Sequence, residues 1–111
     1  MEGNEVASVR NFCDTFGVTQ DSFTRLSGFS PRAVALWSSG RPLGGSAQKR
    51  LRELTRLFEA LSQLVDRDSI GSWLKRPNQA FESSTPLQVI ERGEIDRVWR
   101  MIWQLQTGNT G

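Results

Sequence analysis

Three groups of residues in this sequence could carry chemistry: a lone cysteine, a cluster of carboxylates and a series of arginines. Cys13 is the only cysteine and the chain has no histidine, so neither an internal disulfide nor a Cys/His zinc site can form. Glu91, Glu94 and Asp96 lie around an expected helix start, where acidic side chains favour the positive end of the helix dipole. The sequence contains no phosphate-binding glycine loop and no nucleophile motif. It therefore predicts a protein that is not an enzyme and that needs no cofactor or metal.

Cys13 is expected to act as a small hydrophobic residue rather than as a reactive thiol, because Val9, Phe12 and Phe16 lie at helical spacing around it. A single unpaired cysteine also indicates a reducing compartment. No apolar stretch approaches the roughly 18 residues that span a bilayer, and the N-terminus lacks the pattern of a signal peptide. We therefore expect a cytoplasmic protein without a membrane partner.

The cations are concentrated in one part of the chain. Residues 25–56 contain seven cations and one anion, a net charge of +6 in a chain whose formal total is +2. A solvated helix face could produce this clustering, and so could a surface for a polyanion such as DNA. The seven cations are Arg25, Arg32, Arg41, Lys49, Arg50, Arg52 and Arg56.

Capping residues, prolines and glycines predict an all-α protein without strands. Ser30-Pro31 and Thr85-Pro86 are strong helix starts, because the hydroxyl accepts a free backbone N–H and proline fits the first helical position. Gly17, Gly28 and Gly40 fall where helices need a residue that tolerates positive φ. Helices are expected over residues 5–16, 19–27, 30–39, 45–66, 68–74, 86–92 and 94–106, with a turn-rich stretch over 78–85.

The helix expected over 45–66 is the longest, and its apolar residues recur at steps of three and four. These residues are Leu51, Leu54, Leu57, Phe58, Leu61, Leu64 and Val65. A chain of 111 residues is too short for two large cores, so we expect two subdomains that share packing. Residues 1–66 would form a helix-turn-helix-like subdomain with the long connecting helix, and residues 67–111 a small helical subdomain.

Residues 20–39 resemble the helix-turn-helix of the phage-repressor-like Xre regulators. Gly28 falls at the turn, Phe29 follows it, and Val34 and Trp37 occupy the positions that hold the second helix against the first. In this motif the two helices cross so that the N-terminal end of the second can enter a major groove. The resemblance extends over about residues 5–56.

This resemblance implies a set of DNA contacts, with Gln20 and Arg41 on phosphate and the start of the second helix in the groove. Arg32 alone among the groove residues has the forked donors that read guanine. Thr24 stands where such motifs usually have alanine, and Ser27 where they usually have a buried apolar residue. The alternative is a scaffold that kept the shape and lost base reading. The expected DNA-binding residues are Gln20, Ser30, Pro31, Arg32, Ala33, Leu36, Arg41 and Lys49.

Residues from Trp73 onward resemble the C-terminal domain of MbcA/ParS/Xre antitoxins. The shared pattern is W-L-x-x-P-N, about seven residues, P-L-x-x-I, two residues and G-E, which here begins at Trp73 and ends at Glu94. Family members usually have a glycine in the connection, where this chain has Phe81-Glu82-Ser83-Ser84. The resemblance implies an antitoxin that neutralises a RES-domain toxin, encoded in the neighbouring gene, which consumes or transfers from NAD. It also implies repression of the antitoxin's own operon, for which we expect a homodimer on operator DNA.

The last expected helix has an unusually wide apolar surface. At 100° per residue its apolar side chains cover an arc of about 200°, whereas one core face needs little more than 100°. Trp99 and Trp103 lie on one margin of this arc, where they could anchor a partner or simply enlarge a small core. The expected toxin-binding residues are Trp99, Ile102, Trp103, Gln106, Thr107, Gly108 and Asn109.

Two functions remain open from the sequence. The first is an antitoxin that binds a toxin, and the second is a free-standing transcriptional repressor whose C-terminal half only dimerises. The neighbouring reading frame would distinguish them, because only the first requires a toxin there.

Overall fold

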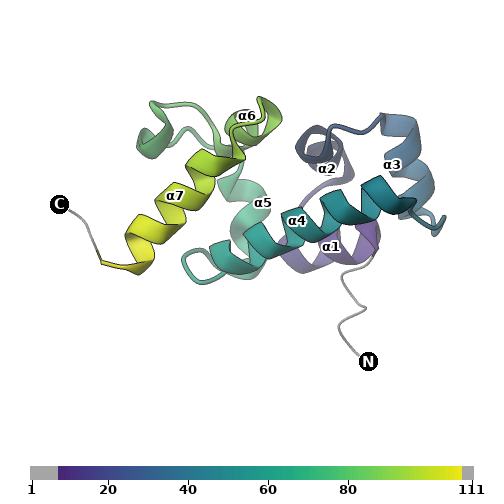
Figure 1. Ribbon diagram of the computed structural model, residues 1–111, viewed down its shortest axis with the longest axis horizontal. Coiled ribbons are helices and arrows are strands. Elements are labelled where there is room, and N and C mark those ends of the chain that lie inside the picture. Colours follow the sequence, from purple (N-terminus) through teal and green to yellow (C-terminus); the bar gives the residue numbers. More distant parts are fainter. Residues whose placement is uncertain (1–7, 109–111) are drawn as a thin grey trace.

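The computed structural model of the chain describes residues 8–108, and within them the chain is entirely helical (Figure 1). The described residues form seven α-helices and two 3-10 helices and contain no strand. The predicted all-α class is therefore confirmed. The elements are α1 (Val9–Phe16), α2 (Gln20–Ser27), α3 (Pro31–Ser38), α4 (Gly45–Leu61), η2 (Arg67–Ser69), α5 (Ile70–Trp73), η3 (Gln79–Phe81), α6 (Pro86–Glu91) and α7 (Ile95–Gln106).

Local capping chemistry determines where four of the helices start. Ser8, Thr19, Ser30 and Thr85 precede α1, α2, α3 and α6, and each hydroxyl accepts a backbone N–H three residues later at 3.0 or 3.1 Å. Thr85 also completes a capping box, since the side chain of Gln88 accepts the Thr85 N–H at 2.8 Å. These are the helix starts that the sequence signals most clearly.

Three expected elements have different boundaries in the structure. The first helix begins at Val9 instead of residue 5, because Ser8 is extended and caps it. The long helix ends at Leu61 instead of residue 66, and Leu64 and Val65 lie in the turns that follow, with both backbone N–H groups on the Leu61 carbonyl at 2.9 Å. The helix expected over 68–74 is divided into η2 and α5.

One hydrophobic core runs through both halves of the described chain. Its centre is a cluster of four phenylalanines, Phe12, Phe16, Phe23 and Phe58, with ring centroids 4.9–5.4 Å apart. Buried side chains of α6 and α7 belong to the same core. Figure 1 shows α4 running along the molecule, and α4 contacts α1, α2 and α7. The two halves therefore share packing, and the division at residue 66 stays a prediction.

Two glycines allow the front and back halves to meet backbone to backbone. Gly17 ends α1 with φ +66°, and a Cβ added there would lie 2.3 Å from the Asp68 carbonyl oxygen. A Cβ added at Gly71, inside α5, would lie 1.8 Å from the Gly17 carbonyl oxygen. Both contacts are with backbone atoms, which cannot move aside as the end of a side chain can. Any side chain at Gly71 would therefore push α5 away from the end of α1.

No helix within residues 8–108 combines the length and the apolar character needed to cross a membrane.

Gly71→Ala should lower the free energy of unfolding by about 2 kcal/mol or more, because its methyl group overlaps the Gly17 backbone. Gly45→Ala is the matched control, since an added Cβ there meets nothing within 4 Å at the start of α4. This control should be neutral or slightly stabilising. Urea unfolding of the parent and both variants measures the difference, and equal midpoints for all three would contradict the close approach.

Candidate functional site

The front half has the geometry expected of a helix-turn-helix. Val34 is fully buried, and the rings of Phe29 and Trp37 pack edge to face with centroids 5.2 Å apart. Gly28 has φ +78° at the turn between α2 and α3. Val34 is therefore buried where α3 contacts α2, and the ring pair packs the turn against α3, whereas the role of these helices in DNA binding stays a prediction.

The two departures from the motif have structural explanations. Ser27 is buried, and its hydroxyl donates to the Thr24 carbonyl at 3.2 Å and accepts the Phe29 N–H at 3.2 Å. The hydroxyl therefore satisfies turn groups that an apolar side chain would leave without a partner. Thr24 is half-buried and donates to the Gln20 carbonyl at 3.0 Å, so its polar atom is also satisfied.

The expected DNA-binding residues lie on or near the exposed side of this half. Arg32, Arg41 and Lys49 are exposed, and their side chains make no hydrogen bond or ion pair within residues 8–108. Ser30 caps α3, and Leu36 is 42% exposed on the same helix. The remaining three are Gln20 and Pro31, which are exposed, and Ala33, which is half-buried.

Two of the seven clustered cations already have partners. Arg25 donates to both oxygens of Glu91, at 2.7 and 3.2 Å, and so links α2 to α6. This hydrogen bonding is the main reason that the pKa of Glu91 lies below its ordinary value. Arg50 pairs with Glu53 at 3.2 Å and donates to the Leu26 carbonyl at 3.0 Å. The sequence could not indicate the Arg25 pair, because Glu91 lies 66 residues away along the chain.

The expected toxin-binding residues of α7 fall into different environments. Trp103 is 63% exposed, whereas Trp99 is half-buried against the core. Ile102 is 1% exposed, so it belongs to the core and not to the exposed face expected for it. It follows Val98 by one helical turn, which places both on the side that faces the core. Gln106, Thr107 and Gly108 are exposed, and Asn109 lies outside the described residues.

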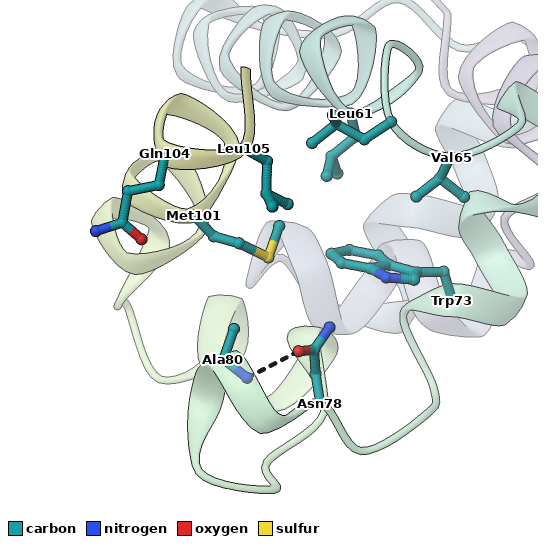
Figure 2. Close-up of a pocket in the computed structure, with 9 residues that line it drawn as sticks. Leu61, Val65, Trp73, Asn78, Ala80, Met101, Gln104 and Leu105 are labelled. Carbon is teal, nitrogen blue, oxygen red and sulfur yellow. Dashed lines mark hydrogen bonds between the residues drawn. The ribbon is translucent and has the colours of Figure 1, made fainter. Parts of the chain in front are cut away.

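The glycine-free connection keeps a left-handed turn. Glu82 and Ser83 have backbone φ values of +56° and +72°, which residues other than glycine seldom adopt. Asn78 organises this turn: its side chain accepts the Ala80 N–H at 2.9 Å (Figure 2). Its backbone carbonyl accepts the Ser83 N–H at 3.0 Å. The turn is therefore held by hydrogen bonds at positions where glycine would be easier to accommodate.

A hollow that sequence analysis missed lies between the end of α4, α5, η3 and α7. Figure 2 shows side chains from these elements converging on it, with Trp73 opposite Met101 and Leu105. The hollow has a volume of about 540 Å³. We call it the α4–α7 hollow, and its lining residues are Leu61, Leu64, Val65, Trp73, Asn78, Ala80, Met101, Gln104 and Leu105.

Cys13 is half-buried beside the core, as expected of a small hydrophobic residue. Burial, and secondarily the negative charge of Asp14, raises the pKa of its thiol to about 11. The thiol is therefore almost entirely protonated at neutral pH, and a protonated thiol is a poor nucleophile.

Comparison with known proteins places this architecture among antitoxins. The sequence profile described as the Antitoxin Xre/MbcA/ParS C-terminal toxin-binding domain matches residues 54–108. Proteins described as mycobacterial cidal antitoxin MbcA, from Mycobacterium tuberculosis and Mycobacterium bovis, are 31% identical over 110 residues, which cover 97% of this chain and 97% of each relative. A crystal structure of the M. tuberculosis MbcT–MbcA toxin–antitoxin complex contains a similar chain, with a TM-score of 0.74 and 27% identity over 96% of both chains.

These similarities cover nearly the whole chain and define its class as that of the antitoxins. The chain belongs to the Xre/MbcA/ParS antitoxin family. Because the relatives are antitoxins, a non-enzymatic class, the prediction that the chain is not an enzyme is confirmed.

Ser83→Gly should stabilise the protein by about 0.5 to 1 kcal/mol, because relief of the left-handed strain exceeds the entropy that glycine adds to the unfolded chain. Ser84→Gly is the matched control, since Ser84 does not have positive φ and should lose stability. Thermal and urea unfolding of both variants measure the signs. A destabilised Ser83→Gly would show that the serine side chain contributes more than the backbone strain removes.

Proposed function

We propose that this chain is an antitoxin that binds and neutralises a RES-domain toxin, encoded in the neighbouring gene, and that it represses its own operon as a homodimer on DNA. The observation that carries the toxin-binding part is the distribution of exposed apolar side chains. Three of the four large hydrophobic residues exposed in the described chain, Leu64, Trp103 and Leu105, lie within residues 54–108, which match the toxin-binding domain. Such exposure is typical of a surface that a partner covers.

The mode of neutralisation is coverage of the toxin, since the antitoxin offers no catalytic group. The family resemblance implies a toxin that consumes or transfers from NAD, and a protein lying over the NAD pocket would inhibit it. Residues 104–111 are the segment proposed to reach that pocket. Co-expression with the neighbouring reading frame tests the proposal: a toxic neighbour that this chain makes harmless supports it, and a neighbour that is not toxic contradicts it.

DNA binding is proposed for the front half, where Arg32 lies at the start of α3 without an intramolecular partner in the described chain. A guanidinium in this position could donate two hydrogen bonds to guanine in the major groove. Arg41 and Lys49, which are exposed, would contact phosphates. A free-standing repressor would show the same DNA binding without a toxic neighbour, so the co-expression experiment separates the two functions.

Trp103→Ala should weaken neutralisation, with a loss of toxin-binding free energy of about 2 kcal/mol if Trp103 is an interface anchor. Its ring is 63% exposed, so the variant should melt close to the parent. Deletion of residues 107–111 should also weaken neutralisation without unfolding the protein. Arg10→Ala, at an exposed position of α1 outside both expected sites, is the control. If cells carrying the toxin survive equally well with Trp103→Ala, the deletion and the parent, the proposed contact is wrong.

Arg32→Ala should lower affinity for the DNA upstream of the operon by about 1 to 3 kcal/mol and reduce discrimination against scrambled DNA. Lys49→Ala should weaken binding to both DNAs and reduce the slope of log K against log salt by about one. Fluorescence anisotropy over a salt series measures both effects, with Arg76→Ala in the back half as the control. If Arg32→Ala discriminates between the operon DNA and scrambled DNA as well as the parent does, Arg32 does not read a base.

A further inference from the structure

We propose that the α4–α7 hollow receives an apolar side chain of the toxin, and that Arg100 beside it pairs with a carboxylate on the same toxin segment. The inference rests on the proposed toxin binding and deepens it, because it assigns a docking site and the chemistry of the segment that fills it. None of the hollow's lining residues is among the seven toxin-binding residues expected from the sequence, although Gln104 and Leu105 lie in the segment 104–111 that is proposed to reach the toxin pocket.

The first argument is that the hollow exposes apolar side chains inside the region that matches the toxin-binding domain. All of its lining residues lie between Leu61 and Leu105, within the matched range 54–108. Leu64 and Leu105 are 38% and 51% exposed, and Trp73 is half-buried. Burial of these exposed side chains against an apolar group of a partner would release water from them and make binding more favourable. The volume of about 540 Å³ is large enough for a side chain together with part of its backbone.

The second argument concerns the polar side chains that line the hollow, Asn78 and Gln104. The Asn78 side chain already accepts the Ala80 N–H, which fixes η3 as one wall (Figure 2). Gln104 is exposed and its side chain makes no hydrogen bond within the described residues. The hollow is therefore lined by apolar side chains together with the polar side chains of Asn78 and Gln104, which suits an apolar side chain whose own backbone can hydrogen-bond at the margin.

The third argument is a free cation next to the hollow. A second depression of about 420 Å³ shares Ala80, Met101 and Gln104 with it and adds Glu82, Arg97 and Arg100. Arg97 pairs with Glu94 at 3.0 Å and with Glu82 at 3.5 Å. The side chain of Arg100 has no ion pair or hydrogen bond within residues 8–108. A carboxylate near the inserted side chain would give Arg100 the partner that it lacks inside this chain.

A second copy of the chain fits this face less well than an acidic toxin segment. In a two-fold interface the same face meets itself, so each group must find its complement on an identical surface. On this face Arg97 pairs with both Glu82 and Glu94, so Arg100 is the cation whose side chain has no ion pair within the described residues, and a two-fold contact would bring two copies of it together. Self-association would therefore bring like charges together, whereas a toxin segment with an apolar and an acidic residue matches both depressions.

Ala80 offers a way to fill the hollow without removing a core contact. Its side chain is exposed and lines both depressions, so Ala80→Trp should occupy them while the backbone bond to Asn78 remains. Ala80→Ser is the matched small control. Leu105→Gln removes apolar lining at a half-exposed position, and Ala35→Gln, which places the same polar side chain at an exposed position of α3 outside the expected DNA contacts, is its control. Arg100→Glu replaces the unpaired positive charge beside the hollow by a negative one.

The experiment titrates each full-length variant with the purified product of the neighbouring reading frame, after thermal melting has shown a parent-like transition. Ala80→Trp and Leu105→Gln should each raise the Kd for the toxin by about tenfold or more, and the Kd of both controls should stay within about threefold of the parent value. Arg100→Glu should slow association, and the effect should diminish at high salt. If Ala80→Trp and Leu105→Gln both bind within threefold of the parent, the docking site is wrong.

Two further results separate this inference from the proposed function and from self-association. If the parent does not bind the neighbour's product at all, the proposed function fails and the docking site fails with it. If the parent binds but the hollow variants bind equally well, only the docking site fails. Sedimentation velocity without toxin gives the third comparison: if Ala80→Trp converts a dimer to a monomer and leaves toxin binding unchanged, the occupant is a second copy and the inference is overturned.

Discussion

The backbone contact between the end of α1 and α5 is the constraint on which the rest of the structure depends. Gly17 turns the chain from α1 toward α2 in a left-handed conformation, and its carbonyl oxygen occupies the space where a side chain at position 71 would stand. This contact joins segments 54 residues apart and leaves no room for adjustment by side chains. It fixes how the helix-turn-helix half lies against the back half, and the phenylalanine cluster then fills the space beside it.

The pair between Arg25 and Glu91 is a second link between the halves, with a different consequence. Both side chains are more than 40% exposed, so the pair adds little to stability in water. Its larger effect is on the distribution of charge, because it turns one arginine of the basic window toward α6. The cations whose side chains have no partner within the described residues near α3 and α4, such as Arg32 and Lys49, therefore make up the basic surface that is proposed to bind DNA.

Sequence reasoning predicted what is determined locally and missed what is assembled from distant segments. Ser30-Pro31 and Thr85-Pro86 identified helix starts because a cap acts within three residues. Nothing near Gly71 in the sequence indicates that the Gly17 backbone will contact it. The α4–α7 hollow was missed for the same reason, since four elements build it and Leu64 was assigned to a helical stripe that ends before it.

The wide apolar arc of α7 follows from the three directions in which this helix faces. Ile102 faces the core, Trp103 is exposed on one flank, and Met101 lines the hollow on the other. Trp103 follows Met101 by two residues, a rotation of about 200° around the helix, so the two side chains leave on opposite sides. A single partner that touches both flanks cannot do so with a flat surface. At 100° per residue the exposed side chains between these two flanks are those of Arg100, Gln104 and Thr107, so a partner that touches both flanks must curve around this face of α7.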